Sequence, residues 1–246
     1  MNFSSISRGT ILGKLIRMPL KLIPKTTILP ILQGELRGYQ WITGSSAHGC
    51  WLGSYEFDKQ ELISKMVQQG YIAFDLGAHV GFYTLLFSKL VGTNGQVVAF
   101  EPFSDNIKLL KKHLQLNLVE NAHVYEAAVA DHGGVAYFEL AENSTMGHIS
   151  SIYHAKLQVK QVSIDELVFS GQLPAPDLIK LDIEGAELMA LKGAMETLRK
   201  YHPIIFLATH SDVLHRDCCK LLLELEYNLK PIGAATLDQT DEILAI

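Results

Sequence analysis

The chain has 246 residues, of which 48% are hydrophobic and 19% are charged, and its mean hydropathy is +0.15. This composition excludes a disordered or collagen-like chain and predicts one α/β domain, with room for a small appendage. The net charge of −5 is unevenly distributed, because residues 1–34 contain five basic and no acidic side chains while the remainder is acidic. An acidic main body argues against nucleic acid as the principal partner, since phosphate binding needs a basic face.

Cysteine usage and apolar runs bear on the cellular compartment. Two of the three cysteines, Cys218 and Cys219, are adjacent, a pattern that matches neither a disulfide framework nor a zinc-ligand set. No apolar run reaches the length of a membrane span, and Lys14, Arg17 and Lys21 interrupt the one stretch that resembles a secretory signal. We therefore expect a soluble protein of the cytoplasm.

Residues 1–55 are predicted to form a basic arm followed by a small extension of strands and turns. Between Ile11 and Ile23 the apolar residues fall roughly on one helical face, although Pro19 should interrupt the helix. This segment could bind a membrane surface or a partner, but we favour an arm that packs on its own domain. Residues 28–55 combine five glycines with aromatic residues, which is typical of short strands and turns.

Residues 56–246 alternate between amphipathic helices and short apolar strands. Helices are expected over 56–69, 80–90, 105–118, 187–199 and 212–226, and strands over 71–76, 96–102, 123–129, 177–183 and 203–209. Residues 135–140 are expected to form a hairpin or edge strand within an insert of about 131–160. Because short apolar strands joined by helices form parallel sheets covered on both faces, the pattern predicts a Rossmann-like α/β sandwich.

The first strand of this domain ends in a turn with the composition of a cofactor site. It reads D-L-G-A-H-V-G, in which Gly77 would supply a tight turn and Gly81 would let the next helix pack closely. A dinucleotide fingerprint would have its second glycine where this chain has His79. A cofactor without a phosphate at this turn therefore fits better, and S-adenosylmethionine is the candidate.

Carboxylates at two neighbouring strand ends could bind that cofactor. Asp75 could bind its α-ammonium, while backbone N–H groups of the turn could bind its α-carboxylate. Glu101 ends the second strand and could accept hydrogen bonds from both ribose hydroxyls. Alternatively, Asp75 only caps the next helix and Glu101 is a solvated strand end. The remaining residues expected at the cofactor are Ala78, His79, Pro102 and Ala127.

Three segments resemble the FkbM family of S-adenosylmethionine-dependent methyltransferases, namely DLGAHVGFYTLLFSKL, AFEPFSDNIKLLKKHLQLN and DLIKLDIEGAELMALKGAMETL. The resemblance extends from about Trp51 to His210 and implies a class I methyltransferase fold that O-methylates hydroxyls on sugars, glycolipids or natural products. The cofactor-binding positions that it implies are Asp75, Gly77, Gly81 and Glu101. The positions that it implies near the reacting centre are Asp182, Glu184 and Glu187.

Methyl transfer to a hydroxyl benefits from a positioned base, and the candidates follow the fourth and fifth strands. Asp182 and His210 are the candidate bases, and Glu184 completes the predicted catalytic group. Lys180, Asp182 and Glu184 alternate along the chain and should share one side of the strand. Lys180 could therefore form a structural ion pair with Asp182 or Glu184 instead. Asp182, Glu184 and His210 could also hold a divalent metal, although none is predicted.

The sequence thus predicts an S-adenosylmethionine-dependent O-methyltransferase that acts on a hydroxyl of a sugar, glycolipid or secondary metabolite. Tyr55 and Glu56 are expected to help close the site, and His148 to line the acceptor pocket or lie on a loop. Two alternatives stay open, an NAD-dependent oxidoreductase on a Rossmann scaffold and a cofactor-binding protein without catalysis. The expected partner is a small-molecule or glycan acceptor, and the basic arm would also suit a peripheral contact with a membrane.

Overall fold

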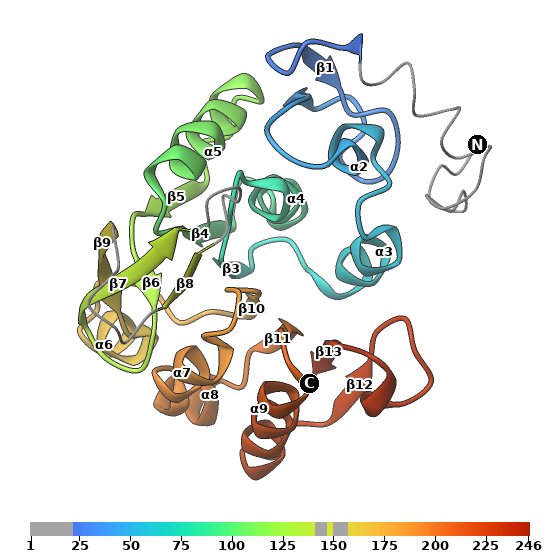
Figure 1. The fold of residues 1–246 in the computed structure, drawn as a ribbon. Coiled ribbons are helices and arrows are strands. Elements are labelled where there is room, and N and C mark those ends of the chain that lie inside the picture. Colours follow the sequence, from blue (N-terminus) through green and yellow to red (C-terminus); the bar gives the residue numbers. More distant parts are fainter. Residues whose placement is uncertain (1–21, 141–146, 150–156) are drawn as a thin grey trace.

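A seven-stranded sheet forms the centre of the protein in a computed structural model that describes residues 22–140, 147–149 and 157–246 (Figure 1). Its strand order is β12-β13-β11-β10-β3-β4-β5. The bounds are β3 Ile72–Leu76, β4 Gln96–Phe100, β5 Ala122–Tyr125, β10 Leu178–Leu181, β11 Ile204–Ala208, β12 Leu229–Pro231 and β13 Glu242–Ala245. β3, β4, β5, β10 and β11 are parallel, whereas β13 is antiparallel to β11 and β12. The predicted parallel sheet is confirmed, and the antiparallel C-terminal edge was not predicted.

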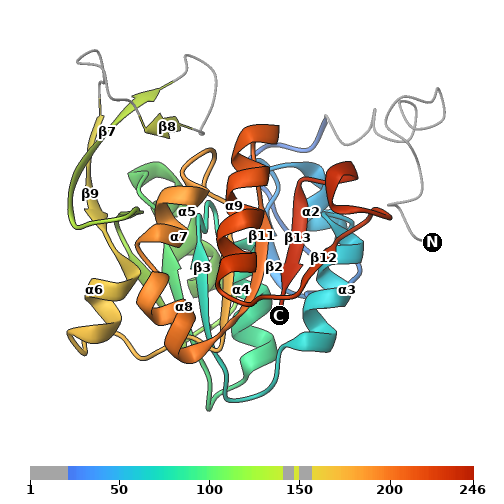
Figure 2. The ribbon, with the colours of Figure 1, turned by 90° about the horizontal axis from the view of Figure 1, so that it is seen from below.

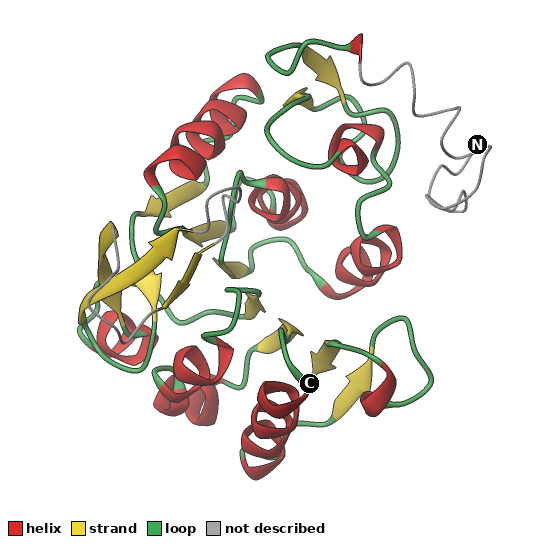
Figure 3. Ribbon diagram, in the orientation of Figure 1, coloured by secondary structure: helices red, strands yellow, loops and turns green. Residues whose placement is uncertain are grey.

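Helices cover both faces of this sheet, as Figure 3 shows. The bounds are α3 Phe57–Met66, α4 Phe82–Val91, α5 Ser104–Leu116, α6 Ile164–Phe169, α7 Glu187–Lys192, α8 Met195–Tyr201 and α9 Asp212–Glu224. Alternate residues of β3 face opposite cores, because Phe74 belongs to the same buried cluster as Leu191 and Leu222, whereas Ala73 belongs to the cluster of Leu85 and Leu110. The sandwich therefore has α3, α4 and α5 on one face and α6 to α9 on the other (Figure 1).

Tertiary contacts divide two segments that the sequence pattern predicted as continuous. The helix expected over 187–199 is broken into α7 and α8 at Gly193, where a Cβ atom would lie 2.0 Å from the Ala130 carbonyl oxygen. The Gly193 carbonyl accepts hydrogen bonds from Ser163 Oγ and Asp165 N. The strand expected over 123–129 is divided into β5 and β6, because β6 (Ala128–Val129) pairs with a different sheet.

That second sheet has four strands in the order β6-β9-β7-β8. The insert supplies β7 (Gly134–Leu140), β8 (Gly147–Ile149) and β9 (Leu157–Val162), so residues 135–140 form a strand here, as expected. It lies at the end of the molecule that is far from β12 and β13 (Figure 2).

The N-terminal extension packs on the face of α4 and α5. β1 (Ile28–Pro30) and β2 (Gln40–Ile42) form an antiparallel pair, followed by α2 (His48–Leu52), a helix that the sequence pattern did not predict. The indole of Trp41 is buried and stacks on the His113 ring of α5 at 3.8 Å. The extension thus shares the core of the main domain.

Most of the predicted amphipathic segment of the arm lies outside the described residues, so its role stays a prediction. Within residues 22–140, 147–149 and 157–246, no helix has the length and apolar character that crossing a bilayer requires.

Candidate cofactor and acceptor site

A cavity of about 460 Å³ lies beyond the carboxyl ends of β3, β4 and β10. β3 is the strand at which the order reverses, since β4 and β5 follow on one side and β10 and β11 on the other. Ligands bind at this position in open α/β sheets, because the connecting loops diverge there. Side chains of the N-terminal extension, including Ser46 and Tyr55, also line the cavity.

In the turn after β3 the backbone passes so close to the segment after β10 that residue 77 has to be glycine. Gly77 has φ +80°, and a Cβ atom there would lie 1.9 Å from the Asp182 carbonyl oxygen. Gly77 N and Ala78 N both donate to the Phe100 carbonyl, which joins the ends of β3 and β4. Gly81 lies behind the cavity, where its missing Cβ lets α4 approach Leu110 of α5. Gly81 therefore allows α4 to pack closely on α5, and not on strand β3.

Glu101 is fixed at the end of β4 by three donors. Its Oε2 accepts from His79 N at 2.8 Å, and its Oε1 accepts from Phe103 N and Asn106 Nδ2, each at 3.0 Å. The carboxyl group is buried, and burial raises its pKa although these hydrogen bonds oppose that shift. Glu101 is therefore not a solvated strand end. Beside it, the cavity is lined by Pro102, Phe103, Ala127, Ala128 and Val129.

Asp75 lies beneath the cavity and does not line it. Its side chain is fully buried, its Oδ2 accepts from Thr84 Oγ1 at 2.7 Å, and its Oδ1 lies 3.4 Å from Lys180 Nζ. Lys180 Nζ also donates to the Gly77 carbonyl at 2.9 Å and lies 3.7 Å from Asp182 Oδ2. Burial disfavours the charged ammonium, but Asp75 and Asp182 together keep the pKa of Lys180 above its usual value. The structure therefore contains the predicted Lys180–Asp182 pair and adds Asp75 to it.

Asp182, Glu184 and His210 converge at the edge of the cavity. His210 Nε2 lies 3.5 Å from Asp182 Oδ1 and 3.3 Å from Glu184 Oε2, and both acidic residues line the cavity. His210 Nδ1 lies 2.8 Å from Glu187 Oε1, which also accepts from Gly185 N. The hydrogen bond to the fully buried Glu187 is the main cause that raises the pKa of His210 to about 9. The imidazole is therefore charged at neutral pH.

The same three residues bear on the metal prediction. Asp182, Glu184 and His210 each offer one ligand atom, and these atoms lie within 4.8 Å of one another. A divalent ion would need His210 Nε2 without its proton, so it would compete with the imidazolium that already balances the two carboxylates. That no metal is bound stays a prediction.

The residues expected to close the site differ in their placement. Tyr55 lines the cavity, whereas Glu56 lies behind it, where its carboxylate accepts from the Tyr83 hydroxyl and lies 3.1 Å from Lys59 Nζ. His148 lies on β8 opposite Glu139, and its side chain is outside the described part of the structure.

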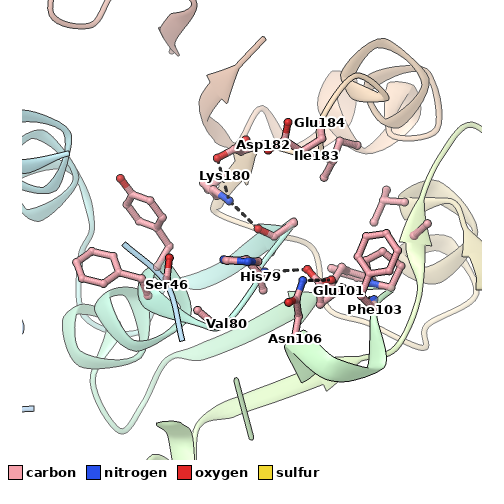
Figure 4. A pocket seen from close by; sticks show the side chains of 18 of the residues that line it. Ser46, His79, Val80, Glu101, Phe103, Asn106, Lys180, Asp182, Ile183 and Glu184 are labelled. Atoms are coloured by element: carbon pink, nitrogen blue, oxygen red, sulfur yellow. Dashed lines mark hydrogen bonds and ion pairs between the residues drawn. The ribbon is translucent and has the colours of Figure 1, made fainter. Parts of the chain in front are cut away.

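Residues of the site that were not predicted from the sequence include Asn106 and Ser46. Asn106 and Ser46 line the cavity, and Figure 4 shows Asn106 beside Glu101 and Ser46 beside His79 and Val80. An Asn five residues after a strand-terminal Glu is a weak signal that could have been used. Ser46 lies in an extension with no motif, so its sequence context offered no signal.

Comparisons with known proteins bear on the family and the fold of this chain. Residues 75–237 match the family described as the methyltransferase FkbM domain. The hexuronic acid methyltransferase AglP of Haloferax volcanii is 28% identical over 169 residues, which are 69% of this chain and 68% of that protein. The crystal structure of the methyltransferase FkbM from Methylobacillus flagellatus KT has a TM-score of 0.53 and 18% identity. That match covers 81% of this chain, which spans only 55% of the other, so it supports the fold alone.

The family match exceeds half of the chain, and the fold, the strand-end cavity and the fixed Glu101 carboxylate are consistent with it. It does not favour the NAD-dependent alternative. The chain belongs to the FkbM methyltransferase family, and its cofactor is S-adenosylmethionine.

Proposed function

We propose that this chain transfers a methyl group to a hydroxyl of a sugar, with glycans that contain a hexuronic acid as the first acceptor class to test. The observation that carries the proposal is the cluster of Asp182, Glu184 and His210 at the edge of the cofactor cavity. Carboxylates and an imidazolium provide the acceptors and donors that sugar hydroxyls need. The name of the Haloferax volcanii relative supports the acceptor class.

The residues of the cavity fit the cofactor. Glu101 presents a carboxylate whose Oε2 accepts from one protein donor, His79 N, and therefore has room for a ribose hydroxyl, and the neighbouring Phe103, Ala127 and Ala128 provide an apolar cleft for a flat purine. S-adenosylmethionine supplies the methyl group and its own leaving group when bound. The protein then has to align the acceptor oxygen and receive its proton.

Asp182 is our candidate for the proton acceptor, in preference to His210. Both ring nitrogens of His210 already face carboxylates, and their charge keeps the ring protonated at neutral pH. Asp182 is ionised, because Lys180 overcomes the effect of burial and holds its pKa below the usual value. A carboxylate is a weak base, but the attacking hydroxyl becomes strongly acidic as its oxygen bonds to carbon. In this proposal, His210 and Glu184 orient the hydroxyl.

A labelled-methyl transfer assay tests the proposal. Purified protein would be incubated with S-adenosylmethionine that carries a labelled methyl group and with free hexoses, hexuronic acids and hexuronic acid disaccharides. Mild alkaline hydrolysis of the product separates the two kinds of oxygen, because it releases methanol from a carboxyl ester and leaves a hydroxyl ether intact. Alkali-stable label in a sugar supports the proposal. Label released as methanol would show that the carboxylate, and not a hydroxyl, accepts the methyl group. Transfer to none of the sugars would refute the acceptor class.

A further inference from the structure

The N-terminal extension supplies one wall of the cavity, formed by Ser45, Ser46, Ala47, Cys50 and Tyr55. We propose that this wall, residues 45–55, receives the amino-acid end of S-adenosylmethionine, with the Ser46 hydroxyl donating to the α-carboxylate. The inference depends on the cofactor and not on the identity of the methyl acceptor, so it can be tested without the acceptor.

The direction of the cofactor follows from the two ends of the cavity. Glu101, Phe103 and Asn106 lie at one end, where the carboxylate and the apolar cleft suit the nucleoside. Ser46 lies at the other end, beyond His79 (Figure 4). An extended cofactor with its ribose at Glu101 therefore directs its amino-acid end toward residues 45–55.

The groups first expected to bind that end already have partners inside the protein. The Asp75 carboxylate is fully buried and is engaged by Thr84 and Lys180. Gly77 N and Ala78 N donate to the Phe100 carbonyl, and His79 N donates to Glu101 Oε2. Each amide has one proton, so these three cannot also donate to a carboxylate without losing a bond.

Residues 45–55 offer polar groups at the required place. The Ser45 hydroxyl donates to the Ile42 carbonyl at 2.7 Å, whereas the Ser46 hydroxyl lines the cavity and shares a hydrogen bond with the Cys50 thiol. Burial raises the pKa of Cys50 to about 12, so the thiol keeps its proton and can donate it to Ser46, which leaves the Ser46 hydroxyl proton for a ligand. A hydroxyl donates one hydrogen bond and accepts two, so it can serve a carboxylate and still accept from a neighbour.

The wall is held in position before any ligand binds. His113 Nε2 accepts from Ile42 N at 3.2 Å, while His113 Nδ1 contacts the carbonyl of the cavity residue Val80 at 2.7 Å. One buried side chain thus ties the extension to the turn that follows β3. A Ser46 hydroxyl on a fixed wall loses little freedom on binding, which favours a real contribution to affinity.

Calorimetric binding of two ligands tests the proposal directly. S-adenosylhomocysteine contains the amino-acid end, whereas 5′-methylthioadenosine has the same nucleoside without it. We expect Ser46→Ala to weaken binding of S-adenosylhomocysteine about tenfold, as for loss of a hydrogen bond to a charged group, and to leave 5′-methylthioadenosine within about twofold. Ser46→Leu should weaken S-adenosylhomocysteine further, because it fills that end of the cavity.

Two control variants complete the experiment. Ser64→Ala removes a hydroxyl on α3 that bonds the Glu61 carbonyl, outside the cavity, and should change neither affinity. Glu101→Gln should weaken both ligands, because both contain the ribose. Retained binding of 5′-methylthioadenosine shows that the Ser46 variants are folded.

Three results would overturn the inference. Equal weakening of both ligands by Ser46→Ala would place Ser46 at the nucleoside, and unchanged binding of both would remove it from the site. Wild-type protein that binds neither ligand would refute the cofactor assignment itself, and the proposal with it.

Discussion

Acidification should destabilise the folded protein through one buried histidine that joins the N-terminal extension to the main domain. His113 is fully buried against Trp41, its Nε2 accepts from Ile42 N, and its Nδ1 faces the Val80 carbonyl. The ring must therefore carry its proton on Nδ1 and stay neutral, since a proton on Nε2 would break the bond to Ile42. Burial is the main cause that lowers the pKa of His113 from 6.5 to about 4.

The sign and size of the effect follow from linkage. The unfolded chain binds a proton at this histidine below pH 6.5 and the folded chain does so only near pH 4, so stability is lost as the pH falls through that window. One pKa unit corresponds to about 1.4 kcal/mol, so this side chain alone should lower the free energy of unfolding by about 2 kcal/mol at pH 5 and about 3 kcal/mol at pH 4.

Urea unfolding of wild type and His113→Gln between pH 7 and pH 4 measures this contribution. The variant is expected to be less stable at pH 7, and the gap to wild type should narrow by about 2 kcal/mol at pH 5, because other titrating groups cancel in the difference. His123→Gln, which removes an exposed ring on β5, is the matched control. A gap that stays constant over the whole range would show that the burial of His113 is not coupled to its protonation.

Three further variants test the framework of the site. Gly77→Ala should lower the free energy of unfolding by more than about 1 kcal/mol, because φ is +80° and the new Cβ meets the Asp182 carbonyl. An unchanged urea midpoint would contradict this close approach of the two backbone segments. Lys180→Met should cost about 3 kcal/mol by leaving the Asp75 carboxylate buried without its cation, and adding Asp75→Asn should recover part of that loss in the same assay. Asp182→Asn should lower kcat at least about 100-fold with unchanged calorimetric affinity for S-adenosylhomocysteine, whereas full turnover would exclude Asp182 as the proton acceptor.

The mostly parallel central sheet and the cofactor edge could be predicted from sequence, because both depend on local patterns. Alternating apolar strands and amphipathic helices specify a parallel sheet, and Gly77 and Glu101 each follow directly from a strand. The carboxyl ends of parallel strands meet at one edge, so two short motifs were enough to bring these residues together.

Partners that come from distant segments could not be predicted in this way. Lys180 is opposite Asp75 because of the register between β10 and β3, and the sequence pattern proposed only partners along its own strand. The helix break at Gly193 depends on contact with Ala130, which lies in another part of the chain. Both the ion pair and the helix break therefore depend on contacts between segments that are far apart in the sequence.

The sequence by itself thus determined the fold class, the family and the strand ends that carry the cofactor site. Only the tertiary structure decided that Asp75 is buried beneath the cavity, that Glu187 holds His210, and that Ser46 lines the cavity. The physical reason is that the spacing of apolar residues in the sequence indicates which face of a helix or strand is buried. Which charged groups meet on that face depends on strand register and on packing between segments far apart in the chain.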